Sequence, residues 1–462
     1  MAGEAQTRIC REGRITEDQM QTHIEHRFDV RPGTTLIEID FDYAPRHASS
    51  GSLTHEISLS LFDPHTGRGA RHNNPDHRIV LRDMVASKGY LPGPLHPGKW
   101  TVSIDVHRII APDQIEYRLQ IRTDTAPNPV EPAMFAPAFC APRGPGWYRG
   151  DLHGHSIHSD ASWDVPEFVD YARRQGLDFV TLTDHNTASG IAECMSLAGD
   201  DLLVMGGTEL TTFWGHCLTI GGQGFVDWRA TKDRPMGTIA AEETDNGNLF
   251  IIAHPTHVGF PHCSGYDWKY PDVMPGVAKI VEVWNGDWSG VANNEAALSL
   301  YYGWLSLGHR LVATAGSDIH APFSKDQRPG YNVVRAEALS HNGILAAIQA
   351  GQLYLSSGPA LEVTDPARDC ATLMGQVLPI AATRLLVEWE DCPPDTTVYV
   401  TRPSDDPLSA ITSEVIGHGA RGKTVVPVDP GPYHDWATIE IRNASGELHC
   451  LANPVFFKNT TI

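Results

Sequence analysis

The stretch DVPEFVDYARRQGLDFVTLTDH, residues 164–185, predicts a helix followed directly by a buried strand. Asp164 can cap the helix, and Glu167 three residues later completes a capping-box spacing. An apolar stripe with helical spacing follows, and Gly176 ends the helix. The strand then runs through LDFVTLTDH, residues 177–185, and finishes on an aspartate and a histidine. This unit predicts an α/β region whose strands end in ionisable residues.

The same arrangement recurs along the chain as far as about Gly351. Further short apolar runs read LLVMGGTE (202–209), LFIIAHP (249–255), IVEVWNG (280–286) and LVATAGSDIH (311–320). Strands that alternate with helical stretches indicate βα units and a mainly parallel, barrel-like arrangement. In such a barrel the carboxyl ends of the strands meet on one face, where functional sites are built.

Imidazoles and carboxylates occur repeatedly at these strand ends. They are His153, His155, His185, Glu209, His254, Asp318 and His320. Buried ionisable groups are costly unless they are paired, so core packing alone does not explain them. Two histidines that are two residues apart on a strand point to the same face and can bind one ion. Imidazole and carboxylate ligands suit zinc, manganese or iron, and the sequence therefore predicts a metal centre.

The motifs that carry these residues resemble one known family. DLHGHSIHSD (151–160), TDHN (183–186), GTE (207–209), GHCLTIG (215–221), AHP and GSDIH together resemble the PHP (polymerase and histidinol phosphatase) family. The preceding WYRG and the flanking β regions resemble its carbaryl-hydrolase-like CehA/McbA branch. The motifs cover about residues 147–358. The resemblance implies a distorted (β/α)7 barrel that holds two or three divalent ions.

The resemblance also implies which residues hold each ion. The first ion would take His153, His155, Glu209 and Asp318. Glu209 would bridge to a second ion, which His216 and His254 complete. The third would take Asp160, His185 and His320. Several relatives have a histidine one residue after the Asp160 position, where this chain has Ala161. The third site therefore depends on Asp160, with His158 left open as a substitute.

This ligand set suits hydrolysis. A water that bridges two cations loses a proton near neutral pH and becomes a nucleophile. Three divalent ions exceed the charge of Asp160, Glu209 and Asp318, which favours an anionic phosphoester, mono- or diester. A carbamate or carboxyl-ester hydrolase is the alternative, because it uses the same attack by hydroxide. A non-catalytic binding protein with a degenerate barrel is a second alternative. The amidohydrolase superfamily is disfavoured, because no strand-end lysine is present and Glu209 fills the bridging position.

Other residues near the motifs have open roles. His257 and His262 could protonate a leaving group or bind substrate, or be merely solvated. Arg149 could pair with a substrate phosphate, with Asp160, or in an ordinary surface salt bridge. Asp151 and Asp184 could orient imidazoles or serve only the fold. No special role is assigned to His23, His26, His72, His77 and His107.

The flanking regions have the alternation of β-strands. TLIEIDFDY (35–43), HEISLSLFD (55–63), WTVSIDVH (100–107) and IEYRLQIRT (115–123) predict an antiparallel sandwich. RLLVEWE (384–390), TVYVTRP (397–403) and ATIEIRN (437–443) predict a smaller one. We therefore expect an N-terminal β-sandwich (1–125), a proline-rich linker (126–146), the barrel (147–358) and a C-terminal β-sandwich (359–462).

Composition limits the partners and the compartment. The 462 residues carry a net charge of -21, which argues against nucleic acid or an anionic membrane as a partner. The 8 cysteines are scattered without a C-x-x-C pair, which fits reduced thiols. The sequence has no apolar run of membrane-helix length and no signal peptide at its start. We expect a cytoplasmic protein that acts on a small-molecule ester, and a homo-oligomer is left open.

Overall fold

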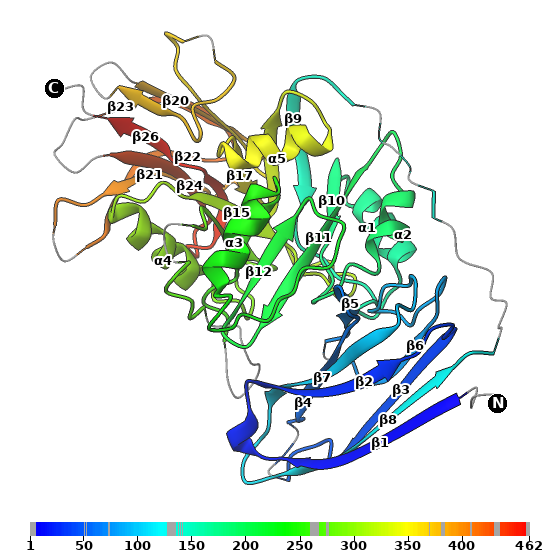
Figure 1. Ribbon diagram of the computed structural model, residues 1–462. Coiled ribbons are helices and arrows are strands. Elements are labelled where there is room, and N and C mark those ends of the chain that lie inside the picture. Colours follow the sequence, from blue (N-terminus) through cyan, green and yellow to red (C-terminus); the bar gives the residue numbers. More distant parts are fainter. Residues whose placement is uncertain are drawn as a thin grey trace.

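A computed structural model gives the structure of this protein. It describes residues 6–49, 51, 53–72, 74–126, 135–136, 138, 140, 142–258, 268–273, 277–368, 370–379, 384–406, 409–428 and 435–458. The first strands lie at one end of the molecule, the middle of the chain forms its centre, and the last strands lie beyond it (Figure 1). None of the helices in these ranges is both long and apolar enough to cross a membrane.

Two four-stranded antiparallel sheets form the N-terminal part. One has the order β1 (Gln6–Ile15), β8 (Ile115–Asp124), β3 (Leu36–Ala44) and β6 (Arg78–Leu81). The other has the order β2 (Thr22–Val30), β7 (Gly98–Arg108), β4 (Glu56–Phe62) and β5 (Gly67–Ala70), and a short 3-10 helix, η1 (Glu17–Gln19), joins β1 to β2. The four strands predicted from alternation in this region are confirmed as β3, β4, β7 and β8. Their apolar residues form one shared core.

In the second of these sheets, β4 and most of β7 are buried on both faces. Ile57 and Ile104 point into the shared core, whereas Ser58, Asp105 and His107 lie on the opposite face and are also buried. That polar face is covered by the middle of the chain, where the rings of Phe213 and Trp228 pack on His107. One face of β4 and β7 therefore packs in the apolar core, and the opposite face carries polar residues that are buried and do not face solvent.

Acidification is expected to destabilise this part of the fold through His77, whose ring packs on Phe41 and Tyr43. Burial lowers the pKa of His77 to about 4, whereas the unfolded chain takes up that proton near pH 6.5. Stability is therefore retained above about pH 6.5 and lost as the pH falls to about 4, by at most about 3 kcal/mol. Urea unfolding at pH 7 and pH 4.5 measures this, and His77→Phe should lose less stability than the wild type. Equal losses would assign the acid sensitivity to other groups.

The middle of the chain alternates strands and helices before a hairpin interrupts the pattern. Its strands are β9 (Gly146–Asp151), β10 (Phe179–Leu182), β11 (Leu203–Thr212), β12 (Gly215–Ile220), β13 (Leu249–Ala253), β14 (Ile280–Asn285), β15 (Val312–Gly316), β16 (Tyr331–Ala336) and β17 (Leu353–Ser356). Its helices are α1 (Val165–Arg174), α2 (Ile191–Ser196), α3 (Met236–Asp245), α4 (Asn294–Ser306) and α5 (His341–Gln349). The helix predicted from the capping box is confirmed as α1, where the side chain of Asp164 accepts from the backbone N–H of Glu167.

The central sheet is mixed, where the sequence predicted a mainly parallel one. Strands β9, β10 and β11 are parallel, as are β13, β14 and β15, but β12 runs antiparallel to both of its neighbours. Phe213 and Trp214 alone separate β11 from β12, and so short a connection can join only antiparallel strands. The sheet also curves back on itself, since Gly154 after β9 pairs with Ile319 after β15.

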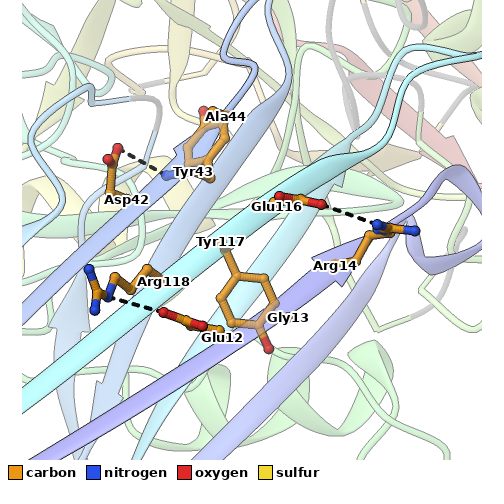
Figure 2. Close-up of a pocket in the computed structure, with 9 residues that line it drawn as sticks. All are labelled: Glu12, Gly13, Arg14, Asp42, Tyr43, Ala44, Glu116, Tyr117 and Arg118. Atoms are coloured by element: carbon orange, nitrogen blue, oxygen red, sulfur yellow. Dashed lines mark hydrogen bonds and ion pairs between the residues drawn. The ribbon is translucent and has the colours of Figure 1, made fainter.

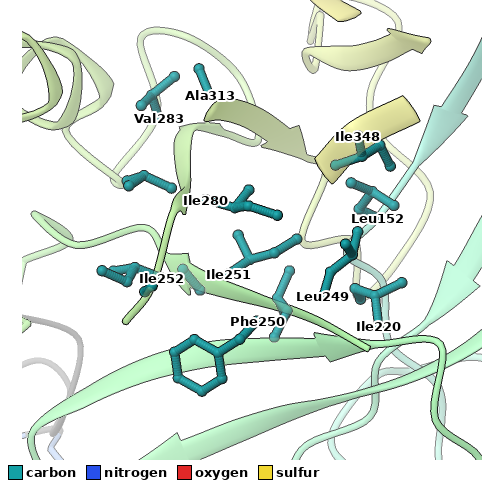
Figure 3. Close-up of a cluster of buried hydrophobic side chains, with 14 of the residues drawn as sticks. Leu152, Ile220, Leu249, Phe250, Ile251, Ile252, Ile280, Val283, Ala313 and Ile348 are labelled. Atoms are coloured by element: carbon teal, nitrogen blue, oxygen red, sulfur yellow. The ribbon is translucent and has the colours of Figure 1, made fainter. Parts of the chain in front are cut away.

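One apolar core contains side chains of the central sheet and of the helices that pack on it. Side chains of β12, β13, β14, β15 and α5 converge there, including Ile220, Ile251, Ile280, Ala313 and Ile348 (Figure 3). All of β13 and β14 is buried, so these strands have apolar contacts on both faces. The core fixes the strand ends on which the ionisable residues lie.

The C-terminal strands continue the central sheet. Strand β17 pairs with β16 on one side and with β25 (Leu448–Ala452) on the other, and the sheet runs on through β24 (Trp436–Arg442), β21 (Thr397–Pro403) and β22 (Ile411–His418). A second sheet of β18 (Ala360–Thr364), β20 (Arg384–Glu390) and β23 (Gly422–Pro427), with β19 (Val377–Pro379) and β26 (Val455–Lys458), completes this region. The strands predicted at 384–390, 397–403 and 437–443 are confirmed as β20, β21 and β24.

Candidate metal centre

The loop after β9 presents two histidines to the same point. His153 and His155 are fully buried, and their Nε2 atoms lie 3.1 and 3.3 Å from Oε2 of Glu209. The loop is held by Thr183, whose hydroxyl accepts from the backbone N–H of Gly154 at 3.0 Å. Both imidazoles of the H-x-H motif therefore reach one carboxylate oxygen, as predicted, although they do so from a loop and not from a strand.

Glu209 on β11 is the centre of the site. Its Oε2 faces His153 and His155, and also His185 after β10, whose Nδ1 lies 2.9 Å away. Its Oε1 faces the other way, 2.9 Å from Nδ1 of His216 on β12 and 3.1 Å from Nε2 of His254 after β13. Five imidazoles from four segments thus surround one buried carboxylate.

Asp318 after β15 joins the first of these groups. Its Oδ1 lies 2.9 Å from Nε2 of His155 and 3.4 Å from Nε2 of His153. Asp318 has φ 51° and His254 has φ 27°, so both are in the left-handed region that non-glycine residues avoid. Such strain costs about 1–3 kcal/mol per residue and persists where the surroundings enforce it, typically at functional sites.

A further group forms around Asp160. Its Oδ1 lies 3.1 Å from Nε2 of His320 and 3.5 Å from Nε2 of His185, and His155 is close enough to share the same ion. His158 is directed elsewhere, because its Nδ1 lies 2.7 Å from the hydroxyl of Ser189. The group predicted for a third ion is thus brought together with His155 added and without His158.

The charges of this cluster suit divalent cations. Burial alone would raise the pKa of Glu209, but the imidazoles of His185 and His153 hold it well below its usual range. Burial lowers the pKa of His216 to about 4, whereas Asp160 outweighs burial at His320 and raises its pKa to about 10. Five crowded imidazoles cannot all be protonated without strong repulsion. Imidazoles with buried carboxylates are the donor set that zinc, manganese and iron(II) accept, and a metal ion would displace protons from these imidazoles, so the residues fit divalent ions.

Glu282 in the middle of β14 belongs to the cluster but was not identified from the sequence. Its Oε1 lies 2.9 Å from Nδ1 of His153, and its Oε2 accepts from the backbone N–H of His254 and the amide of Asn285. Asn285 in turn donates to Asp318 at 3.3 Å. A charged residue inside the otherwise apolar run IVEVWNG was the available signal, because an isolated buried carboxylate is costly.

Replacing Glu282 with Gln is expected to weaken metal binding and lower turnover by about 10- to 100-fold, the usual effect of losing the partner of a ligating imidazole. The amide keeps the size of the side chain but loses the charge that orients His153. Competition with a chelator measures the metal affinity. Glu243→Gln is the matched control, because Glu243 is a buried glutamate on α3 whose partner is Asn248. Wild-type affinity in Glu282→Gln would remove Glu282 from the centre.

The two aspartates beside the ligands act on backbone and hydroxyl groups. Oδ1 of Asp151 accepts from the backbone N–H groups of His153 and Ser317. Asp184 accepts from the backbone and hydroxyl of Ser156 and from the hydroxyl of Ser159. Both aspartates therefore hold the loops that carry the candidate ligands. The contact that orients an imidazole, considered above for Asp151 and Asp184, is made to His153 by Glu282.

The remaining predicted residues lie at different distances from the centre. The half-buried ring of His257 lies 5.7 Å from that of His254 and could face a substrate. His262 lies outside the described residues. The guanidinium of Arg149 lies over the ring of Tyr331 at 4.6 Å. Of the alternatives left open for Arg149, the pairing with Asp160 is not observed, since the described partners of that carboxylate are histidines.

A cavity of about 720 Å³ lies elsewhere, on the N-terminal strands β1, β3 and β8. Figure 2 shows its charged side chains in pairs, Glu12 with Arg118 and Glu116 with Arg14, at 3.3 and 3.1 Å. Its remaining lining residues include Asp42 and Tyr43 but no histidine. Charges that already satisfy each other offer little to a ligand, so we place the chemistry of this protein at the metal centre.

Comparison with known proteins finds no matching family model and no matching curated protein. Among solved structures, the chain is similar to a two-domain protein from Bacteroides vulgatus that contains a predicted PHP-like metal-dependent phosphoesterase. The identity is 16%, the alignment covers 70% of this chain and 100% of the other, and the TM-score is 0.39.

Two further solved structures are similar over a smaller part. A proposed metal-dependent phosphoesterase from Bifidobacterium adolescentis is 16% identical over 38% of this chain and 89% of its own, with a TM-score of 0.28. An amidohydrolase from Chromobacterium violaceum, solved with sulfate and no metal, is 18% identical over 37% of this chain and 88% of its own, also at 0.28. Because these TM-scores are low, the function proposed below rests on this chain's own buried cluster of imidazoles and carboxylates.

Proposed function

We propose that this protein is a metal-dependent hydrolase that cleaves phosphoesters, mono- or diesters, of small molecules. The observation that carries the proposal is the position of Glu209, whose two oxygens face two separate groups of imidazoles. A carboxylate placed in this way can bridge two cations. The PHP-like motifs support the same reading, with a distorted (β/α)7 barrel of the CehA/McbA type between two β regions.

Divalent ions bound in such a centre lower the pKa of coordinated water and polarise a phosphoryl oxygen. The residues of the chain supply the geometry. Glu209 would bridge the first two ions, with His153, His155 and Asp318 on one side and His216 and His254 on the other. Asp160, His185 and His320 would hold a third ion at the edge of the centre, where His320 is partly exposed.

The balance of charge supports an anionic substrate. Glu282 adds a fourth carboxylate to Asp160, Glu209 and Asp318, but three divalent ions still leave the centre with excess positive charge. An anion that enters this pocket is attracted, whereas a neutral carbamate or carboxyl ester gains less. The carbamate or ester hydrolase remains the competing reading, since the same ligands can activate water for either reaction.

Two measurements on one preparation test this proposal. Elemental analysis of protein purified without chelator should find two to three transition ions per chain in this centre. This number follows from the ligand count, because each ion usually takes three or four protein ligands. Aryl phosphate, bis-aryl phosphate and aryl carbamate substrates then distinguish the reactions. We expect higher kcat/KM for one of the phosphoesters. Preference for the carbamate would replace the phosphoesterase reading, and less than one ion per chain after reconstitution would favour a non-catalytic protein.

A further inference from the structure

A second cluster of buried imidazoles and a carboxylate lies in the N-terminal part, outside the motifs found in the sequence. Glu56 on β4 and His107 on β7 point to the polar face of their sheet, and His72 follows β5. Their exposed fractions are 8%, 1% and 5%. Each offers one ligand atom, and these three atoms all lie within 4.8 Å of one another.

The two imidazoles of this cluster are incompletely hydrogen-bonded. Oε1 of Glu56 lies 3.2 Å from Nε2 of His72, and the rings of His72 and His107 meet edge to face at 4.6 Å between centroids. The Nδ1 atoms of both rings are buried without a hydrogen-bond partner among the described residues. An unsatisfied buried polar atom destabilises the fold. Each ring therefore has a nitrogen that the described residues leave without a partner.

The other contacts of the cluster are those of a prepared ligand set. Nε2 of His107 lies 2.7 Å from the hydroxyl of Ser58, and metal-binding histidines are commonly oriented through their second nitrogen in this way. Arg108 lies on the Oε2 side of Glu56, at 3.8 Å, so Oε1 remains on the side of the imidazoles. His77, by comparison, uses its Nε2 on the backbone carbonyl of Ile57 and packs among aromatic rings. Its Nδ1 is also buried without a partner among the described residues, but no group of possible ligands forms around it there.

We propose that Glu56, His72 and His107 bind a divalent transition ion of the zinc class, separate from the ions of the central sheet. Two imidazoles and a carboxylate are a known zinc ligand set, and a water or a further side chain would complete the coordination. The ion would connect β4, β7 and the segment after β5. The site adjoins the main centre, because the ring of His72 lies 5.0 Å from that of His185. This inference does not depend on the hydrolase activity.

Metal counting on the wild type and three variants tests the site. Each protein is stripped, reconstituted with Zn²⁺, freed of excess ion and analysed for zinc per chain. His107→Phe should lose one ion relative to the wild type. Glu56→Gln, which keeps the shape of the side chain, should lose the same ion at limiting Zn²⁺. His77→Phe is the matched control and should retain the wild-type count, because it removes a buried histidine of the same sandwich outside the cluster.

A Glu209→Ala background separates this site from the main centre. In that background the remaining zinc should fall by one on adding His107→Phe, and Zn²⁺ should raise Tm by less once His107 is replaced. Co²⁺ should give visible absorption bands that His107→Phe removes. Wild-type zinc counts in folded His107→Phe and Glu56→Gln would overturn the proposal. If His107→Phe does not fold, Glu56→Gln alone decides, and an unchanged count and affinity in that variant overturns it. Loss of hydrolase activity in any protein leaves this comparison unaffected.

Discussion

Replacing Glu209 with Ala is expected to lower turnover by at least about a thousandfold, because the water-activating ions supply much of the rate. The substitution removes the one carboxylate that five imidazoles share and leaves two groups of ligands without their common anion. Bound metal should fall by at least one ion per chain. Steady-state kinetics and elemental analysis on the same preparation measure both effects.

Two controls separate chemistry from folding in this experiment. Glu243→Gln alters a buried glutamate outside the centre and should keep both metal and activity. Glu209→Gln keeps the side-chain volume but cannot supply a bridging charge, so it should behave like the alanine variant. A folded Glu209→Ala protein with near-normal turnover would disprove the bridging role.

Replacing His185 with Ala is expected to remove one ion and to lower kcat/KM by about a hundredfold or more, through lost stabilisation of charge in the transition state. His185 lies between two carboxylates, 2.9 Å from Glu209 and 3.5 Å from Asp160. The two ions held mainly by other ligands should remain. Metal content and kinetics with the preferred phosphoester give the result.

The competing explanation is that His185 only forms a buried pair with Asp160. Loss of one partner of a buried pair destabilises the fold, so His185→Ala would then lower Tm without changing the metal count. His77→Ala provides the comparison, because it removes a buried imidazole from the N-terminal core. An unchanged metal count in His185→Ala would rule out the third ion as assigned.

Local sequence was sufficient for the elements that carry the ligands. Helix α1 begins where Asp164 and Glu167 form a capping box, which depends only on residues close in sequence. His153 and His155, expected on one face of a strand, instead lie in the loop after β9, where both still reach Oε2 of Glu209. The grouping of the other candidate ligands was implied by the resemblance to the PHP family, because no pattern of neighbouring residues predicts that Asp160 lies beside His320.

Residues inside fully buried strands could not be assigned from pattern. All six residues of β14 are buried, so no alternation marks the face on which Glu282 lies. The hairpin of β11 and β12 also interrupts the predicted βα alternation, because only Phe213 and Trp214 connect the two strands. That hairpin brings His216 beside Glu209 on neighbouring antiparallel strands.

The sequence by itself determined which imidazoles and carboxylates follow the strands, the helix that precedes β10 and the sandwich pattern of the first strands. Only the tertiary structure decided what covers the polar face of β4 and β7. Alternation predicts a face that avoids the apolar core, and such a face is normally solvated. Here the middle of the chain packs against it, so Glu56 and His107 are buried and His72 meets His185. Contacts between segments more than a hundred residues apart depend on how whole sheets pack, which no short stretch of sequence encodes.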